Sequence, residues 1–541
     1  MSEFNLKKHG VVLLIIVLVL LGGYLRSYHI GYPVIGYHNW KEVHYLTEAR
    51  NFARDGFFTN GFFVPTFDYP ALSAEGDSAS GTHPDTFPLP QIILAILFKI
   101  FGVSITLARL LSVLASVLSI PLAFFIGKKL FHRTEWGLLI ATLVTINPLF
   151  IFFGRNFQLD SFGLFLALLS TYFYFSWTEN HNSRSLAWSM FFLGLSTITK
   201  YTFLIFAIPM FFSFPWREEL KNWKKYIKPS LPLLMIPLWL FYEQIILQSR
   251  LLGGISEDFT YDISVLFSSE VQQTLKAYIA DNYTMLGWYI ALIGIVLFLL
   301  NYFFTKEKSW MMKYVLGCIV SLPLFIVLSI NKLSGHNYHQ YPVAFFIVLF
   351  MAYTAIIIAE SLREYSPYST YVFAIILIAL LWSPSMESKD RMFNTQFPGL
   401  EVAGEYIKSH SVLSEKILFP SGQSYGVLWH ADRKGYKNPG TIEGIKDAEV
   451  KGATWMYIYQ WGFSVAQNVD VWKYVQESYH LEQATFQLGS DGKPQIFSLI
   501  LKKGGNFSDA DINTLAQTHQ PVESTYEYSN GVQKLFTISA S

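Results

Sequence analysis

The segment HNWKEVHYLTEARNF, residues 38–52, follows the first long apolar run, and its residues 41–50 gather five acidic or basic side chains within about three helical turns. These are Lys41, Glu42, His44, Glu48 and Arg50. Ionisable groups beside a bilayer are costly, so they indicate a functional site unless a structural partner explains them. Glu42, a carboxylate with basic residues on both sides, is the hardest of the five to explain without a function.

Further ionisable and aromatic groups recur along the chain. They are THPD, with His83 and Asp85 and with Asp68 and Asp77 upstream; GRNFQLD, with Arg155, Gln158 and Asp160; Lys200 between two apolar runs; and GHNYHQY, with His336, Tyr338, His339 and Tyr341. Cations among them could neutralise a phosphate that gains charge as a bond breaks. Asp160 is the second candidate carboxylate.

Each group also has a structural explanation. Arg155 could anchor a helix end at the interface, and Asp160 could cap the helix that follows. The two tyrosines of GHNYHQY could belong to the aromatic belt. Its two histidines could be interface residues or could bind a phosphate or a metal, but two histidines three apart are a poor zinc signature. We therefore assign no metal ligand and no certain cofactor, and leave a divalent cation as an open alternative.

Membrane helices must position these residues. The 541-residue chain is 52% hydrophobic and only 15% charged, whereas a soluble domain is about 25% charged. The formal net charge of +1 argues against nucleic acid as a partner. The single cysteine, Cys318, lies in an apolar run and allows neither an intramolecular disulfide nor a CxxC metal site.

Eleven apolar runs approach the length of about 20 residues that a spanning helix needs, and we predict that these eleven cross the membrane. They lie near 10–27, 104–127, 135–153, 160–178, 185–200, 201–215, 229–247, 284–304, 309–330, 341–360 and 367–384. The two runs around residue 200 are short and could be tilted or re-entrant. The first run resembles a signal peptide, but RSYH after it is too bulky for a cleavage site, so we expect an uncleaved helix.

Short loops rich in Lys and Arg mark the cytoplasmic side. This rule places the N-terminus and the loop 216–228 inside, provided that the apolar segment 88–102 lies in the outer interface instead of crossing. The loop 28–87 and all residues after 385 are then outside, as are Lys200 and the groups named above. We predict a multi-pass protein of a bacterial inner or archaeal plasma membrane, with a membrane domain over 1–385 and a periplasmic or extracellular domain over 386–541.

The predicted external domain has the composition of a soluble protein. KILFPS (416–421) and TWMYIYQ (454–460) are typical of strands, whereas EVAGEYIKSH, TIEGIKDAEVKG and VDVWKYVQESYH are typical of helices. This alternation predicts a small α/β layer. We find no GxGxxG, nucleophile elbow or paired Cys/His ligands in this part, so we expect an accessory domain.

The order of these pieces resembles the GT-C superfamily of integral-membrane glycosyltransferases, in particular the branch of protein O-mannosyltransferases and aminoarabinose transferases. Residues 40–52 resemble the first external loop of that branch, although Lys41 stands at the first acidic position and His44 at the Asp of the Trp-Arg-x-Ala-Asp version. His83-Pro84 is similar to the His-Pro-Pro segment, and the span from Arg155 to Asp160 to the second external Arg…Asp turn. WHADRKGY (429–436) resembles a bacterial tail motif.

The resemblance implies an α-helical GT-C membrane protein that transfers a sugar from a polyprenyl-phosphate donor to a hydroxyl of a lipid, glycan or protein, with inversion. It implies Lys200 as a ligand of the lipid phosphate, with Arg155, His336, His339, Tyr338 and Tyr341 near the donor. His44, Arg50, His83, Asp85 and Gln158 would position substrates. Glu42 or Asp160 would be the base, or the activity is lost. A non-catalytic sugar-lipid binder or flippase partner is the alternative, and a transporter ranks last because we find no inverted repeat.

Overall fold

The computed structural model describes residues 2–70, 81–247, 263–461 and 465–540. The chain divides into two compact units. We call the first the helical unit; it comprises Met1–Ile30, Asp85–Pro90 and Thr106–Met392. The second, the sheet unit, comprises Gly31–Pro84, Gln91–Ile105 and Phe393–Ser541. Most of the first predicted external loop thus belongs to the same unit as the C-terminal residues, and the domain boundary at 385 stays a prediction.

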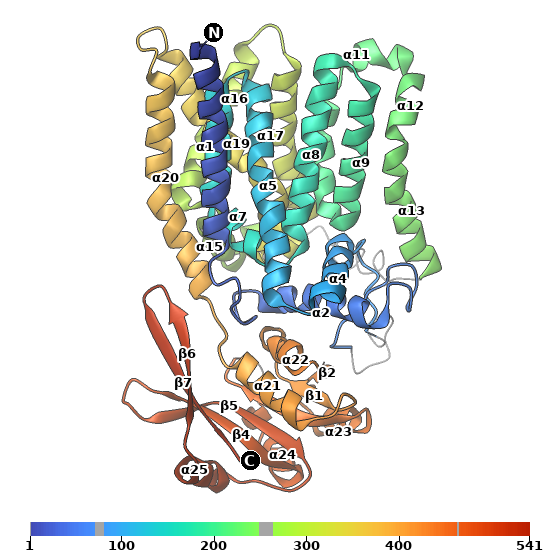
Figure 1. Ribbon diagram of the computed structural model, residues 1–541, viewed down its shortest axis with the longest axis vertical. Coiled ribbons are helices and arrows are strands. Elements are labelled where there is room, and N and C mark those ends of the chain that lie inside the picture. The colour runs from blue at the N-terminus through green and yellow to red at the C-terminus, as the bar shows by residue number, and fades with distance from the viewer. Residues whose placement is uncertain (1, 71–80, 248–262, 462–464, 541) are drawn as a thin grey trace. The chain divides into compact units, whose positions relative to one another are not determined.

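The helical unit is a bundle in which the longest helices run side by side, joined by shorter ones (Figure 1). They are α1 (Ser2–Arg26), α5 (Ile105–Phe131), α6 (Thr134–Ile146), α7 (Pro148–Arg155), α8 (Leu159–Asn180), α9 (Ser183–Thr199), α10 (Ala207–Ser213), α11 (Trp216–Glu219), α12 (Lys224–Ser230), α13 (Met235–Phe241), α15 (Ser269–Tyr283), α16 (Met285–Phe304), α17 (Trp310–Leu328), α18 (Ile330–Leu333), α19 (Tyr341–Ser361) and α20 (Ser369–Asn394). Tight 3₁₀ turns, η1 (Tyr201–Phe206) and η6 (Asn337–Gln340), precede α10 and α19.

All eleven predicted apolar runs form helices. Among the described residues, eight helices are long and apolar enough to cross a membrane, or nine if the bent pair α6–α7 is one span. The two runs around residue 200 are shorter: α9 has 17 residues, and η1 with α10 covers Tyr201–Ser213. Only Lys200, in an extended conformation, separates them. The expected brevity of this pair is confirmed, and so is the multi-pass helical fold.

The bend between α6 and α7 measures 57° and has a local cause. Pro148 begins α7 because it lacks the N–H that would continue the preceding helix. The side chain of Asn147 accepts a hydrogen bond from the backbone N–H of Phe150 at 3.2 Å and so caps the new helix. Helix α7 begins at this bend and ends at Arg155, directly before the turn that leads to Asp160.

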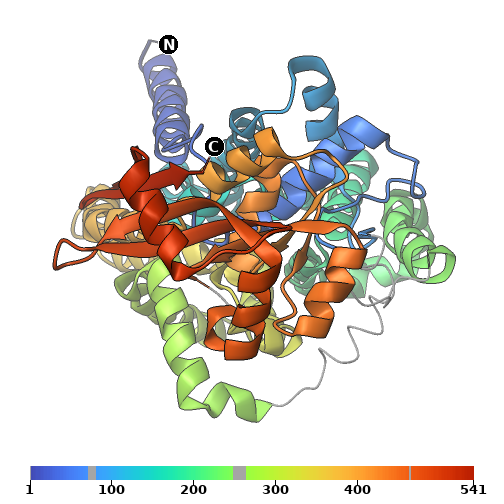
Figure 2. The ribbon, with the colours of Figure 1, turned by 90° about the horizontal axis from the view of Figure 1, so that it is seen from below.

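The sheet unit is built on a seven-stranded sheet in the order β2-β1-β3-β5-β4-β7-β6, which Figure 2 shows with its helices. The strands are β1 (Lys416–Phe419), β2 (Gly435–Lys437), β3 (Ala453–Tyr459), β4 (Tyr479–Leu488), β5 (Pro494–Lys503), β6 (Val522–Tyr528) and β7 (Gly531–Ser539). Strands β2, β1 and β3 are parallel, and the other pairs are antiparallel.

Successive residues of the central strands enter two different hydrophobic cores, because side chains of a strand alternate between its faces. Leu418 packs in the core with helices α23 (Ile442–Val450), α24 (Val469–Ser478) and α25 (Asp509–Thr518). Its neighbours Ile417 and Phe419 pack in the other core, with α21 (Leu400–His410) and α22 (Gly426–Ala431). Both predicted strands and all three predicted helices of this part are confirmed.

Two N-terminal helices also contribute to the sheet unit. Helix α2 (Asn39–Asp55) buries 12 of its 17 residues. Its Asn39 amide donates to the backbone oxygen of Gln423 at 3.0 Å, so α2 contacts the C-terminal part of the chain. Helix α4 (Leu89–Phe101) coincides with the apolar segment that we predict at the interface, and most of it belongs to this unit.

Candidate functional site

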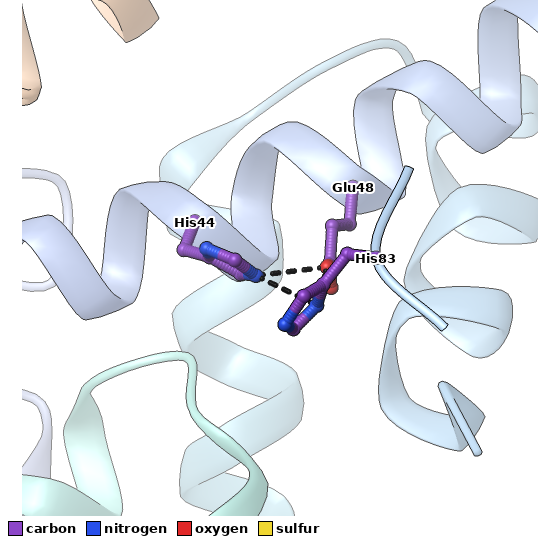
Figure 3. A group of neighbouring side chains, drawn as sticks. All are labelled: His44, Glu48 and His83. Carbon is purple, nitrogen blue, oxygen red and sulfur yellow. Dashed lines mark hydrogen bonds and ion pairs between the residues drawn. The ribbon is translucent and has the colours of Figure 1, made fainter. Parts of the chain in front are cut away.

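One polar cluster of the sheet unit joins helix α2 to the THPD segment (Figure 3). His44 and Glu48 are four residues apart on α2, so both project from the same helix face. Oε1 of Glu48 lies 2.9 Å from Nε2 of His44 and 2.8 Å from Nδ1 of His83. The two imidazole nitrogens lie 3.1 Å apart. Three atoms that could ligate a metal ion therefore lie close to one another.

Neighbouring polar groups hold this cluster in place. The Gln91 amide donates to the second oxygen of Glu48 at 2.8 Å, and the hydroxyl of Tyr69 contacts Nδ1 of His44. Tyr69 in turn stacks on Tyr425, with ring centroids 4.2 Å apart. Burial favours the neutral carboxyl, but the charges and hydrogen bonds of the two histidines outweigh it and lower the pKa of Glu48 to about 2.

Arg50, on the same helix, has a structural role. Its guanidinium pairs with the buried carboxylate of Asp68 and lies 3.0 Å from Oδ1 of Asp432. It also lies over the ring of Trp429, 4.8 Å from the centroid. A planar cation held on three sides fixes α2 against the WHADRKGY segment. These contacts give Arg50 a structural role, and its predicted role in positioning a substrate stays a prediction.

Glu42, the predicted base, is buried on the first turn of α2, with 2% of its surface exposed. It precedes His44 by two residues, which turns its side chain about 200° around the helix axis from that of His44. Glu42 therefore projects from a different face of α2 than the cluster of His44, Glu48 and His83.

A second cluster lies in the helical unit, at the break after α9. Lys200, whose side chain is 12% exposed, forms an ion pair with Oδ1 of Asp160, which is completely buried. The Lys200 ammonium also lies 5.5 Å from the centroid of the Tyr338 ring. Oδ2 of Asp160 and both polar atoms of the Gln158 amide are buried and have no hydrogen-bond partner among the described residues.

The remaining candidates of the helical unit have varied surroundings. Arg155 is buried, and its guanidinium donates to the backbone oxygens of Tyr28 and His29 at 3.3 and 3.4 Å. His336 and His339 flank Tyr338, with ring centroids 5.2 and 4.5 Å from it. The others are Tyr341, which packs edge-on against Phe150, and Asp85, whose backbone oxygen accepts from the Tyr201 hydroxyl at 3.0 Å. Asp77 lies outside the described residues.

The structure thus brings Asp160, Lys200 and Tyr338 together in one unit, and His44 with His83 in the other. Glu48 is the residue of the second group that sequence reasoning left out of the site. The spacing His44-x₃-Glu48 on a predicted helix could have indicated it, because residues four apart share a helix face. No comparable sequence signal marks Gln91 or Tyr69.

Comparison with known proteins concerns the family of one segment and the fold of the chain. Residues 82–246 match the family model of dolichyl-phosphate-mannose-protein mannosyltransferases. The archaeal oligosaccharyltransferase AglB from Archaeoglobus fulgidus, in complex with an inhibitory peptide and a dolichol-phosphate, is 12% identical with a TM-score of 0.58, over 91% of this chain and 74% of that chain. The same organism's oligosaccharyltransferase tethered with an acceptor peptide is also 12% identical, with a TM-score of 0.57 over 92% and 74% of the two chains.

ArnT from Cupriavidus metallidurans in the apo state is 12% identical, with a TM-score of 0.51 over 98% of both chains. No curated protein matches the sequence. At these identities the likeness to solved structures concerns the fold. Residues 82–246 are therefore similar to the mannosyltransferase family model, and the chain as a whole has the GT-C fold of these solved structures, as the resemblance of its motifs predicted.

Proposed function

We propose that this protein transfers a sugar from a polyprenyl-phosphate donor to an acceptor hydroxyl at the outer face of the membrane. The GT-C fold and the mannosyltransferase-family domain support this reaction class. AglB, which shares the fold, is known in complex with a dolichol-phosphate, so the fold can hold a polyprenyl phosphate. The acceptor class, whether lipid, glycan or protein, is left open.

The observation that carries the proposal is the polar cluster at Lys200. Buried polar atoms almost always have a hydrogen-bond partner, yet Oδ2 of Asp160 and the whole Gln158 amide have none among the described residues. Such groups fit a ligand rich in hydroxyls, as a sugar is. The adjacent Lys200 ammonium supplies positive charge where little water solvates a phosphate. Acceptors and donors of hydrogen bonds thus stand beside a cation.

The chemistry follows from these parts. The bond between the anomeric carbon and the phosphate oxygen breaks, and a bond to the acceptor oxygen forms on the opposite face, so the configuration inverts. The lipid phosphate leaves with an additional negative charge, which Lys200 would stabilise. The acceptor proton passes to a carboxylate. We assign this role to Glu42, with Asp160 positioning a substrate; Arg155, Tyr338, His336, His339 and Tyr341 stay candidate donor contacts, and His44, His83, Asp85 and Gln158 stay candidate positioning residues.

Transfer of a radiolabelled sugar from defined lipid donors, with the full-length protein in detergent, tests the proposal. Glu42→Gln keeps size and hydrogen bonding but cannot accept the proton, so turnover should fall about 10²–10⁴-fold while donor binding survives. Lys200→Met should weaken donor binding roughly ten- to a hundredfold, because a charge-assisted contact contributes about 1.5–3 kcal/mol. Lys129→Met removes a lysine from a different ion pair of the helical unit, that between Lys129 on α5 and Glu179 on α8, and should change neither quantity.

The carboxylate assignments can be reversed by the same assay. If Glu42→Gln transfers sugar normally while Asp160→Asn is inactive with donor bound, Asp160 is the base. If both variants are active, the carboxylate mechanism is wrong. Donor binding without transfer, for every acceptor tried, would favour the alternative of a sugar-lipid binder, which the Lys41 and His44 departures from the acidic motif suggest.

We also propose that the sheet unit faces the outside and the N-terminus the cytoplasm. The distribution of Lys and Arg in the short loops supports this orientation. Because Cys318 is buried, a cysteine introduced at Val450, which is exposed on α23, should be the only residue that a thiol reagent labels rapidly. A membrane-impermeant maleimide should label Val450→Cys in intact cells. Protection of that cysteine until the membrane is permeabilised would overturn the orientation.

A further inference from the structure

We propose that His44, Glu48 and His83 form a binding site for a divalent transition-metal ion of the zinc class. The site does not depend on the proposed glycosyl transfer, because it rests on the side chains of the sheet unit alone. In the proposed transfer, Lys200 supplies the positive charge and Glu42, on another face of α2, is the base. The acid of this cluster, Glu48, has no role in that mechanism.

The distances between the three ligand atoms fit one metal ion. They are 2.9 Å from Nε2 of His44 to Oε1 of Glu48, 2.8 Å from Nδ1 of His83 to the same oxygen, and 3.1 Å between the two nitrogens. With bonds of about 2.0–2.1 Å, the ligand atoms of a tetrahedral zinc site lie roughly 3.3 Å apart. A shift of a few tenths of an ångström would therefore seat the ion.

In both ligands that α2 supplies, His44 and Glu48, the second polar atom of the side chain already has a partner. Gln91 donates to Oε2 of Glu48 at 2.8 Å, which leaves Oε1 for the metal. The Tyr69 hydroxyl contacts Nδ1 of His44, which leaves Nε2 for the metal. Metal-ligating histidines and carboxylates usually have such outer partners, which fix their orientation. His83 needs little fixing from outside, because its Pro84 neighbour restricts the backbone.

Hydrogen bonds alone explain the same contacts less well. If both imidazoles carry their proton at these nitrogens, which are only 3.1 Å apart, the positive ends of the two donors lie side by side; in the other tautomer one nitrogen accepts from the other, and only one of them donates to the carboxylate. A divalent cation in this place attracts all three ligand atoms. One carboxylate and two neutral imidazoles would leave the site with a net charge of about +1.

The site is closed on one side and open on the other. The Glu48 and His44 side chains are 1% and 11% exposed, whereas the His83 side chain is 32% exposed. Three protein ligands leave one tetrahedral position for water or for a hydroxyl or phosphate oxygen of a substrate. Imidazole nitrogen is a ligand that zinc accepts readily, whereas magnesium prefers oxygen ligands, so we expect zinc to bind and magnesium not to compete.

The experiment measures zinc, not activity. Full-length protein in detergent is stripped with a chelator, and Zn²⁺ is titrated against a chromophoric competitor. We expect one zinc per chain, and His44→Ala and His83→Ala should each weaken binding at least tenfold. Glu48→Gln keeps the shape of the buried residue and should weaken binding similarly, so the prediction stays testable if an alanine variant misfolds. Gln91→Leu should weaken it about 10- to 100-fold, because it removes an outer partner.

His480→Ala is the matched control. Nε2 of His480 also lies 2.8 Å from a carboxylate, that of Glu482, but no third ligand joins this pair in the part of the chain that the structure describes. Its zinc affinity should equal that of the parent protein. Zinc binding that is absent, or equal in the His44, His83 and Glu48 variants, would overturn the site. A transferase without zinc refutes only the site, and a zinc-binding protein without transfer refutes only the proposed function.

Discussion

Removal of the Lys200 charge should destabilise the helical unit strongly. The Asp160 carboxylate is completely buried, and its one ion-pair partner among the described residues is Lys200. Breaking a buried pair by deleting one partner costs about 3–5 kcal/mol, because the other charge is left uncompensated. We therefore expect Lys200→Met to lower the free energy of unfolding by about that amount. Oδ2 of Asp160 has no hydrogen-bond partner that could take over.

A double-mutant cycle separates this effect from loss of the lysine stem. Asp160→Asn removes the acid charge, so the variant with both substitutions should recover a large part of the stability that Lys200→Met loses. The matched control is Lys129→Met, which breaks the partly exposed pair with Glu179 and should cost less than about 1 kcal/mol. Equilibrium unfolding of the full-length protein in mixed micelles, followed by tryptophan fluorescence, measures all four variants.

Two outcomes would refute the reasoning. Lys200→Met could cost no more than Lys129→Met, which would mean that water or lipid headgroups solvate the Asp160 charge. The costs of Lys200→Met and Asp160→Asn could also add without coupling, which would mean that the two groups do not interact. The cycle also separates loss of donor binding from loss of stability. The double variant should be stable and should still lack the donor affinity that Lys200 provides.

Three further predictions concern stability. Burial raises the pKa of Glu401 above its ordinary 4.5. The folded protein therefore holds the Glu401 proton more tightly than the unfolded chain does, and it loses stability as the pH rises above about 4.5. Glu401→Gln should remove that loss and raise the thermal midpoint at pH 7. A Cβ at Gly294 would lie 2.1 Å from a backbone oxygen of α19, so Gly294→Ala should cost about 1–3 kcal/mol in micellar unfolding, whereas Gly10→Ala, with open space around it, should not. Arg50→Ala leaves its buried partner Asp68 without an ion pair and should cost about 3–5 kcal/mol in the same measurement. Alanine at the exposed Arg54 should cost less. Equal costs for the two glycine variants, or for the two arginine variants, would contradict the packing described.

The fold was largely predictable because long apolar runs identify membrane helices from composition alone. Every apolar run of the sequence became a helix, and the basic loops and strand patterns needed no tertiary information. Strand β2 and strands β4 to β7 were not predicted. Their residues mix polar and apolar types, since β6 and parts of β4, β5 and β7 are exposed on at least one face. Pairing across the sheet, not local periodicity, specifies these strands.

The candidate site was predictable only in part. Asp160 and Lys200 are 40 residues apart in the chain, and only the order of spans suggested a common side. The sequence could not show that Arg50 is held by Asp68 and Trp429, because side-chain partners depend on tertiary packing. For the same reason it could not show that Glu48 stands beside the two histidines of its cluster. A charged residue in a motif is recognisable from the sequence as costly to bury. The partner that compensates its charge is not.

The residues that cover helix α2 also set a condition on how the protein is made. Arg50 donates to the backbone oxygen of Trp429, 379 positions later in the chain. At a synthesis rate of roughly 5–20 residues per second, the helix waits about 20–75 seconds for that partner. During this time its buried polar face has no C-terminal cover, and a chain truncated before the sheet never supplies one. Biogenesis therefore needs the nascent helix to be held by lipid, by the emerging helical unit or by a chaperone until translation ends.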